Sequence, residues 1–506
     1  MPSEINNRHG AARRPNVIWI IADQLRAQSF GYRGDPNVRT PNIDNLARRG
    51  VRFDSAVAGA PWCSPFRAAM LTSTYPHQNG VTRTPSPLDP ALPTVALPMR
   101  EAGYHTAWVG KWHVDGSNSG DHIVPRERRG EFDYWRGYEN NNAQEESYVF
   151  GGYTDPEHPA YDESDETPVR LPGYETDSLT DLFLGHLNQH VSSTRNGEGE
   201  YQPFFAALSV QPPHSPYVGP GSGLGAPFGS NTGLRHHADA SEQPHSGGYQ
   251  PYSDRGPRWP PITPGQVTLR PNVPQVDRIQ EQARLDYAGY ASMVENLDWN
   301  AGRVLSALRE LDADRETWVM FFSDHGDMLG SHGQWEKSSP WEESVRIPFI
   351  VARVAGHQAM PTGVSDALVN HVDIAPTTFG LCGVTVPEWA AGHDYSARCL
   401  RAGAAGDATA GEPTSAYLQQ IPRKYHRHSV NRAWRGVVTR DGWKYVCTPG
   451  NDWLLHNLRE DPYEQANLCY DTAYQTQKER CHAELERWIR ETGDEFELPE
   501  IALEPQ

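Results

Sequence analysis

The sequence predicts an α/β protein built on a doubly wound, mostly parallel sheet, with a smaller antiparallel α+β subdomain at the C-terminus. Three observations support this fold class. Continuous apolar, β-branched runs alternate with helical patterns up to about residue 322. Each of these runs is followed at once by polar residues. Beyond about residue 403 the pattern changes to short strand-like runs separated by turn residues, which is typical of antiparallel pairing.

Four apolar runs are typical of strands buried on both faces of a parallel sheet. They cover residues 16–22, 105–109, 204–210 and 317–322. Helical patterns separate them, such as the one over residues 41–50, where Thr40 is expected to be the N-cap, Pro41 the first helical residue and Gly50 the C-cap. A longer helix is predicted over about residues 276–311.

The polar residues that follow these strands are expected to converge on one site, because ligands of doubly wound sheets bind beyond the carboxyl ends of the strands. They are Asp23, residues 110–113, residues 211–214, and Asp324 with His325.

Two stretches interrupt the alternating pattern. Residues 219–274 are rich in Gly, Pro, Ser and His, which predicts a long loop or lid. A Gly/Ala linker after residue 403 precedes strand-like runs at 416–419, 435–439, 443–447 and 453–456, an Asp441-Gly442 hairpin turn and a closing helix over 473–492. We therefore predict a flexible tail (1–14), a main catalytic α/β domain (15–402) and a C-terminal subdomain (403–506).

Composition narrows the class of protein. The 506 residues carry a formal net charge of -19, which argues against nucleic-acid binding and against adhesion to an anionic membrane. No apolar run approaches the ~20 residues of a membrane span. The apolar run after the polar N-terminus is too short for a signal peptide, so we expect a cytoplasmic protein, or a periplasmic or secreted one if a leader has been removed. Six cysteines in 506 residues are too few for a disulfide scaffold, and none of them forms a C-x-x-C pair that would indicate a zinc site.

Cys63 stands in the pattern C-x-P-x-R, with Pro65 and Arg67 at the required offsets and a helical run after it. Such a match would arise by chance in about a few per cent of chains of this composition, and its plain reading is a buried cysteine in a turn. The surrounding sequence decides whether Cys63 belongs to a functional motif or is only a buried cysteine.

Over nearly its whole length the chain resembles the type I sulfatase family, whose fold is that of alkaline phosphatase. The segments that carry the resemblance occur in family order: PNVIWIIADQ, TPNIDNLARRGVRF, CSPFRAAMLTSTYPH, GYHTAWVGKWH, PPHSPY, SDHGDMLGSHGQWEK, ESVRIPFIV and LLHNLREDPYEQANL. The resemblance implies a sulfuric-ester hydrolase. It also implies that a formylglycine-generating enzyme converts Cys63 to formylglycine, an aldehyde whose hydrate is the nucleophile.

The resemblance further implies a divalent cation, Ca²⁺ first, with Mg²⁺ or Mn²⁺ as alternatives. Its ligands would be Asp23, Gln24, Asp324, His325 and the formylglycine made from Cys63. Oxygen-rich ligation agrees with a hard cation. Arg67 would orient the hydrated aldehyde, Lys111 and Lys337 would flank the sulfuryl group, His214 with Lys337 would protonate the leaving alcohol, and His113 would remove the proton that lets sulfate leave. Ser64, Phe66 and the tryptophans 62, 108, 112 and 335 are read as structural or pocket wall.

Two ligands depart from the commonest family pattern, in which an Asp stands in place of Gln24 and an Asn in place of His325. The same Gln and His variants occur in related phosphonate monoester and phosphodiester hydrolases, so a hydrolase of that kind is the alternative. A non-catalytic anion- or glycan-binding protein is a third hypothesis, should Cys63 escape oxidation.

The expected substrate is a small-molecule or oligosaccharide sulfate ester. A screen of sulfated mono- and oligosaccharides would identify it. A basic cluster near the C-terminus could contact an anionic sugar or could be a solvated charge run. Its members are Arg423, Lys424, His426, Arg427 and His428. The sequence leaves the oligomeric state open.

Overall fold

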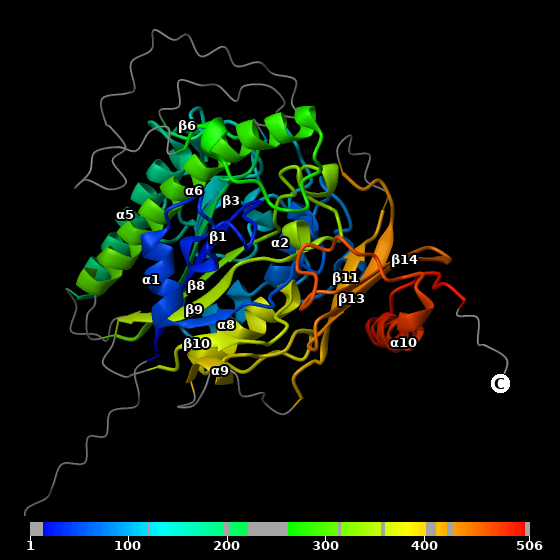
Figure 1. Cartoon of the computed structure of the whole chain (residues 1–506). Helices are drawn as coiled ribbons and strands as arrows, with labels where there is room; N and C mark the ends of the chain where they lie inside the picture. The colour runs from blue at the N-terminus through cyan, green and yellow to red at the C-terminus, as the bar shows by residue number, and fades with distance from the viewer. Residues whose placement is uncertain are drawn as a thin grey trace, which may run out of the picture.

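The computed structural model describes residues 14–119, 122–195, 202–220, 262–311, 315–355, 360–400, 411–422 and 429–500. An eight-stranded sheet forms its centre, in the order β10-β2-β9-β8-β1-β7-β3-β4 (Figure 1). Pairing is parallel throughout except along β9, which is antiparallel to both of its neighbours. The strands are β1 (Asn16–Ala22), β2 (Val51–Phe53), β3 (His105–Lys111), β4 (Tyr134–Tyr138), β7 (Phe204–Val210), β8 (Thr317–Ser323), β9 (Phe349–Ala355) and β10 (Gly363–Ser365).

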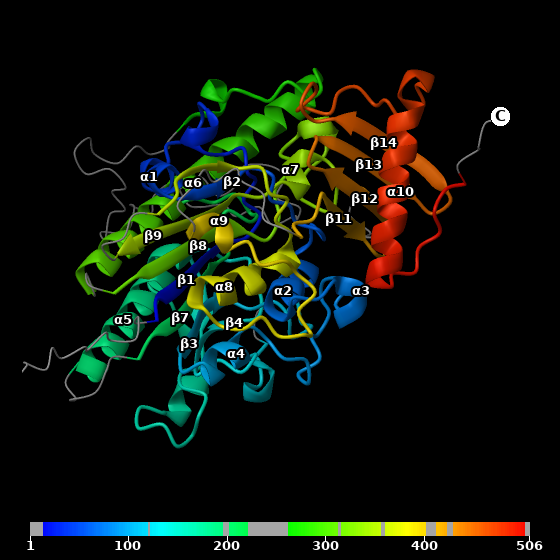
Figure 2. The ribbon, with the colours of Figure 1, turned by 90° about the horizontal axis from the view of Figure 1, so that it is seen from below.

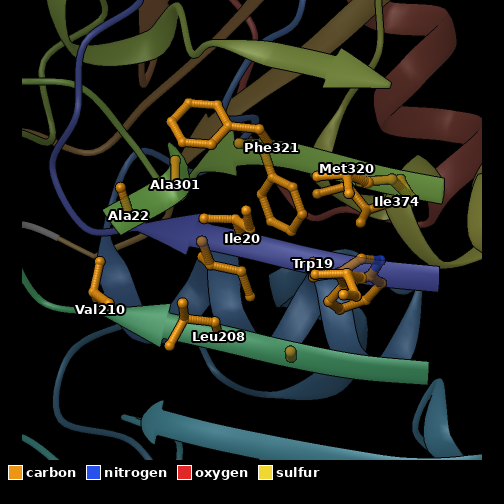
Figure 3. Packing of buried hydrophobic residues seen from close by; sticks show 14 of the residues in the cluster. Trp19, Ile20, Ala22, Leu208, Val210, Ala301, Met320, Phe321 and Ile374 are labelled. Carbon is orange, nitrogen blue, oxygen red and sulfur yellow. The ribbon is translucent and has the colours of Figure 1, made fainter. Parts of the chain in front are cut away.

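Strand β1 lies in the middle of this sheet, between β7 and β8, and every one of its residues is buried. Ile20 pairs with Leu208 on one side and Phe321 on the other, so the three apolar runs of the sequence meet in register. Figure 3 shows Trp19 and Ile20 on successive positions of β1, Trp19 beside Ile374 and Ile20 on the side of Ala301. Burial on both faces explains why these strands are continuously apolar rather than alternating.

Helices cover both faces, as the doubly wound prediction requires. Helices α1 (Pro41–Arg49), α5 (Glu175–Arg195) and α6 (Asp277–Leu311) pack together on one face. Helices α8 (Ile374–Cys382) and α2 (Cys63–Thr72) pack on the opposite face (Figure 2). On this face Trp19 Nε1 donates to Thr378 Oγ1 of α8. Shorter helices are α3 (Pro76–Asn79), α4 (Ala96–Glu101), α7 (Glu342–Val345) and α9 (Ala397–Leu400).

The N-cap of α1 is Thr40, as expected, and a second helix completes the capping. Thr40 and Gly50 flank the helix as predicted, but the Thr40 side chain makes no capping hydrogen bond. Asp298 of α6 accepts instead from the backbone N–H groups of Asn42 (3.3 Å) and Ile43 (2.8 Å). A carboxylate from another helix thus satisfies the free N–H groups of the first turn, which sequence-local reasoning does not detect.

A second, antiparallel sheet forms the C-terminal part in the order β11-β12-β13-β14. Its strands are β11 (Ser415–Gln420), β12 (Trp434–Thr439), β13 (Trp443–Thr448) and β14 (Asn451–Asn457), and helix α10 (Gln475–Thr492) packs against β12 and β13. This confirms the smaller antiparallel α+β element, which Figure 2 shows at the side of the main sheet. A small hairpin pairs β5 (Tyr148–Val149) with β6 (Val169–Arg170). The domain boundaries stay a prediction.

Three sequence predictions lie wholly or largely outside the described residues: the tail over 1–14, most of the loop over 219–274, and the basic cluster at 423–428. Within the described part of the chain, no helix combines the length and the apolar character needed to cross a bilayer.

Candidate active site

The polar residues that follow four neighbouring strands, β8, β1, β7 and β3, lie at one edge of the main sheet. Asp23 follows β1 and Asp324 follows β8, while Lys111 is the last residue of β3 and His214 lies in the turn after β7. The carboxyl ends of parallel strands share one edge, so residues far apart in the sequence meet there.

Cys63 is the first residue of α2, and this helix is buried along its whole length. The Cys63 Sγ atom lies 3.1 Å from His325 Nε2, 3.3 Å from Lys337 Nζ and 3.6 Å from Asp23 Oδ1. Burial acts to raise the pKa of this thiol, but the cations of Lys337, His325 and Lys111 outweigh it and lower the pKa well below the usual value.

The other five cysteines differ from Cys63 in their environment. All six are buried and free of disulfides, but burial raises the pKa of each of the other five. A nucleophile or its precursor needs a site that stabilises negative charge. The structure provides such a site at Cys63 and at none of the others, which are Cys382, Cys399, Cys447, Cys469 and Cys481.

Four of the predicted ligands, Asp23, Cys63, Asp324 and His325, present donor atoms that all lie within 4.8 Å of one another. His325 is held by a contact of 3.0 Å between Nδ1 and the Gly326 carbonyl, which leaves Nε2 facing Asp23 Oδ1 at 3.4 Å and Asp324 Oδ1 at 3.6 Å. Burial acts to lower the pKa of His325, but Asp324 and Cys63 outweigh it and raise the pKa. The centre of the site therefore attracts positive charge, and its two carboxylates and one imidazole fit a divalent cation.

Gln24, the fifth predicted ligand, lies beside this group with a positive φ of 65°. Its backbone N–H donates to Asp324 Oδ1 at 3.0 Å, and its side-chain Oε1 accepts from Lys337 Nζ at 2.8 Å. The amide oxygen thus contacts the same ammonium that lies 3.3 Å from Cys63 Sγ.

Arg67 and Lys111 form ion pairs with the carboxylates of Asp23 and Asp324. Arg67 lies one helical turn after Cys63, with Nε 3.2 Å from Asp324 Oδ2 and a second nitrogen 3.5 Å from Asp23 Oδ2. Lys111 Nζ lies 2.6 Å from Asp23 Oδ2. Burial and Cys63 act to raise the pKa of Asp23, yet Lys111, with His214 and Lys337, holds it below the usual range. The role expected of Arg67 toward the hydrated aldehyde stays a prediction.

Lys337 joins the nucleophile position to His214. Its Nζ lies 2.5 Å from His214 Nε2 as well as 3.3 Å from Cys63 Sγ. The other ring nitrogen of His214, Nδ1, lies 2.6 Å from the Ser215 carbonyl, which can only accept a hydrogen bond. This contact places the Nδ1 proton and leaves Nε2 for proton exchange at the site.

His113 is buried beside Cys63, with a positive φ of 62°. Burial and the Lys111 cation lower its pKa to about 4, although its interaction with Cys63 acts in the opposite direction. The ring is therefore neutral near pH 7 and able to accept a proton.

The C-terminal sheet fixes the segment that carries Lys337. Trp434 Nε1 of β12 donates to the Ser338 carbonyl at 3.1 Å, and the Ser429 hydroxyl donates to the carbonyl of Lys337 itself. Lys444 of β13 donates to the Pro340 carbonyl at 2.9 Å. The small sheet therefore positions a residue of the main site.

Several buried residues around the site were not singled out from the sequence. Glu175 of α5 accepts from Tyr138 Oη (2.6 Å) and the Gln211 backbone (2.9 Å) behind the site, and burial raises its pKa to about 7. Asp327 and Tyr217 contact each other and lie inside the quoted segments SDHGDMLGSHGQWEK and PPHSPY, where only neighbouring residues were given roles. Ser64 and Phe66 are buried, and Ser64 bonds Thr84, but their reading as structural residues stays a prediction.

The family profile described as Sulfatase matches residues 15–384. The chain belongs to the sulfatase family. A second profile, described as N-sulphoglucosamine sulphohydrolase, C-terminal, matches residues 330–491. The resemblance seen in the sequence is thereby confirmed, and the protein is a sulfatase, an enzyme that hydrolyses sulfate esters. A divalent cation and a formylglycine are properties of this family.

Relatives match this sulfatase over almost its whole length. An ulvan-active sulfatase of Formosa agariphila is 28% identical over 97% of this chain and 84% of its own. An N-acetylglucosamine-6-O-sulfatase of Bacteroides thetaiotaomicron is 26% identical over 97% of this chain and 88% of its own. A solved structure in complex with its substrate D-glucosamine-2-N,6-O-disulfate has a TM-score of 0.72 and 22% identity over 95% of this chain and 99% of that one. This last likeness shows the sulfatase fold.

Proposed function

We propose that this sulfatase removes sulfate from a carbohydrate sulfate ester, with residue 63 in its formylglycine form as the nucleophile. The observation that carries the proposal is the environment of Cys63 Sγ, which lies within 3.6 Å of an imidazole, an ammonium and a carboxylate at the buried sheet edge. The carbohydrate class is supported by relatives named for activity on ulvan and on N-acetylglucosamine 6-O-sulfate esters.

The cation is proposed to be Ca²⁺, held by Asp23, Gln24, Asp324, His325 and the modified residue 63. Carboxylate and amide oxygens favour a hard ion, while the imidazole also permits Mn²⁺. When bound, such a cation supplies electrophilic polarisation of the sulfuryl oxygens.

The chain's own cations have distinct tasks in this proposal. Lys111 holds Asp23 charged and in place at 2.6 Å, and Arg67 contacts both Asp23 and Asp324 at 3.2 to 3.5 Å. Burial and the neighbouring Asp23 raise the pKa of Asp324, which His325 and Arg67 oppose. Lys337, 3.3 Å from Cys63 Sγ, lies where it can neutralise a sulfuryl oxygen during attack.

The two histidines are assigned to the two proton transfers. The hydroxylate of hydrated residue 63 bonds to sulfur, and the sulfur–oxygen bond to the alcohol breaks. His214 Nε2, an acceptor because Nδ1 carries the ring proton, takes a proton from the Lys337 ammonium and passes it to the departing ester oxygen, which leaves Lys337 neutral. His113, neutral near pH 7, takes the proton of the remaining hydroxyl on residue 63, and the carbon–oxygen bond to sulfate then breaks to release the anion.

Maturation requires a partner in this proposal. Cys63 must be oxidised to the aldehyde, which we assign to a formylglycine-generating enzyme acting on the C-x-P-x-R segment. That segment lies in a buried helix of the folded chain, so oxidation before or during folding is the expected order.

The experiment compares substrates on protein of known modification state. The sulfatase is co-produced with a formylglycine-generating enzyme, the aldehyde content of the peptide containing residue 63 is measured by mass spectrometry, and a panel of sulfated mono- and oligosaccharides is screened for sulfate release. An aryl phosphodiester and a phosphonate monoester are assayed beside them, because Gln24 and His325 favour that alternative. A higher kcat/KM for a sugar sulfate supports the proposal, whereas turnover of the phosphorus esters alone overturns it.

The cation is tested in the same preparation. Metal-depleted enzyme is reloaded separately with Ca²⁺, Mg²⁺ and Mn²⁺. Recovery that is greatest with Ca²⁺ supports the assignment, and greatest recovery with either other ion overturns it.

A further inference from the structure

Asp327 is a buried carboxylate beside the site that the assignments above leave without a task. Its Oδ1 accepts from the backbone N–H groups of Leu329 and Glu336, both at 3.0 Å. Its Oδ2 accepts from Gln24 Nε2 and from the Tyr217 hydroxyl, both at 2.7 Å. Asp327 thus binds four donors from three segments, those that carry Gln24, His214 and Lys337.

The contact with Gln24 decides which way the Gln24 amide points. An ionised carboxylate can only accept hydrogen bonds, so the amide must turn its NH₂ group toward Asp327. Its Oε1 is then directed the opposite way, where it lies 2.8 Å from Lys337 Nζ. Lys337 has no acceptor, so both neighbours demand the same orientation.

We propose that Asp327 is a positioning residue that holds the Gln24 amide with Oε1, not Nε2, toward the cation. The inference rests on the metal assignment made under the proposed function. A side-chain amide is a neutral ligand in place of a carboxylate, and Asp327 supplies a negative charge one hydrogen bond behind it. A charge-assisted bond of this kind also polarises the amide, which makes Oε1 a better ligand.

The substitution Asp327→Asn tests this at nearly constant volume. The backbone donors of Leu329 and Glu336 cannot reverse, so the introduced amide must turn its oxygen to them and its NH₂ group toward Gln24 and Tyr217. The Tyr217 hydroxyl can accept as well as donate, but Gln24 can be satisfied only by turning its own amide over. Its NH₂ group would then face the cation.

We expect Asp327→Asn to weaken Mn²⁺ binding by about 10- to 100-fold. Binding is measured on the purified protein from the electron paramagnetic resonance signal of free Mn²⁺, which does not depend on turnover. Tyr217→Phe is the matched control, because it removes one donor from the same Asp327 oxygen without changing what Gln24 must do. It should bind Mn²⁺ nearly as the wild type does.

A second substitution separates positioning from a general loss of structure. In the Asp327→Asn background, Gln24→Glu supplies a carboxylate that can accept from the introduced amide with one oxygen and face the cation with the other, so affinity should recover. Made alone, Gln24→Glu places two carboxylates 2.7 Å apart and should bind Mn²⁺ more weakly than the wild type, despite the added negative ligand.

The outcomes are distinct. Wild-type Mn²⁺ affinity in a folded Asp327→Asn variant overturns the inference and leaves the metal assignment intact. Failure of the double variant to recover affinity also overturns it. If Asp327→Asn does not fold, tighter binding by Gln24→Glu alone overturns the inference, and weaker binding supports it. A wild type that binds no divalent cation overturns the metal assignment and the inference together.

Discussion

The ammonium nitrogen of Lys337 lies 2.5 Å from Nε2 of His214, although 123 residues separate the two in the sequence. The turn after β7 supplies the imidazole, and a segment held by the C-terminal sheet supplies the ammonium. Because Lys337 also lies 3.3 Å from Cys63 Sγ, this pair connects the nucleophile position to the group that can protonate a leaving alcohol. The C-terminal sheet therefore contributes to the chemistry of the main sheet.

This pairing predicts how the His214→Ala variant depends on the substrate. Sugar alcohols are poor leaving groups that need a proton, so their hydrolysis should slow by about 10²- to 10⁴-fold. An aryl oxide leaves without that help, so an activated aryl sulfate should lose about tenfold or less. The ratio of kcat for the two substrates, measured in wild type and variant, is the test. Equal losses on both would remove His214 from the acid role.

The environment of Cys63 predicts that it is the one cysteine of the six that activity requires. Cys63→Ala should lower sulfate release by at least about 10³-fold, and the aldehyde should vanish from the peptide mass spectrum. The matched control is Cys481→Ala, a buried cysteine in α10 that should keep its activity at a cost of about 1 kcal/mol in the free energy of unfolding. Substantial sulfate release by Cys63→Ala would contradict the nucleophile assignment.

Sequence reasoning located most of the fold because the strands that matter are buried on both faces. The apolar runs that became β1 and β7 match the observed bounds residue for residue, and β3 and β8 extend slightly past the predicted ends. Four strands of the main sheet were not identified. Strands β2 and β10 have only three residues each, too short for a periodic signal, and the longer β4 and β9 were missed as well. The four C-terminal strands and their closing helix were identified from turn residues and spacing.

The predicted site residues follow a buried strand or have a role that the family resemblance implies, which is why the sequence could name them. Asp327 and Asp298 could not be found in that way, because each acts across a long sequence separation. Asp327 bonds Gln24 over 303 residues, and Asp298 bonds Ile43 over 255. No local pattern records which donor a buried carboxylate will meet, since that depends on how the sheet and its helices assemble.

A group of histidines at the opposite end of β3 predicts loss of stability in acid. His105 begins β3, its Nε2 lies 2.9 Å from His186 Nε2 of α5, and its ring stacks on His190. Burial and then the neighbouring histidines lower the pKa of His105 well below its usual value and that of His186 to about 3, and burial also lowers that of His190. The folded state therefore holds these rings neutral.

The sign follows from proton linkage. Below about pH 6.5 these histidines become protonated in the unfolded chain but stay neutral in the folded chain. The free energy of unfolding therefore falls as the pH falls from about 6.5 toward 3. His186 alone should cost about 2 kcal/mol between pH 6.5 and pH 5. His186→Phe keeps the stacking on Tyr134 but cannot be protonated, so the difference in unfolding free energy between pH 7.5 and pH 5 should shrink by that amount. An unchanged difference, measured by urea unfolding at both pH values, would contradict this.

The cluster of four proposed ligands around Cys63 predicts that Asp324 is needed to retain the cation. Asp324→Asn removes one of two carboxylates and should lower metal affinity by at least about 100-fold, measured as metal content after dialysis. Asp373→Asn is a suitable control, because Asp373 is also buried but caps the Asn370 and His393 backbone away from the site. A chelator should inhibit the wild type, and added Ca²⁺ should restore it. Full activity after thorough demetallation would exclude a role for the cation.

The neutral, buried ring of His113 predicts a different defect from that of His214. If His113 acts after the alcohol has left, His113→Ala should slow sugar and aryl sulfates alike, because the step that it serves no longer contains the alcohol. The sulfated form of residue 63 should then accumulate during turnover. Acid quenching followed by mass measurement of the peptide containing residue 63 detects it as added sulfate. The wild type and His214→Ala should show little, since in the latter the first step is slow and the second is intact. Sulfate retained by His214→Ala and absent from His113→Ala would reverse the two assignments.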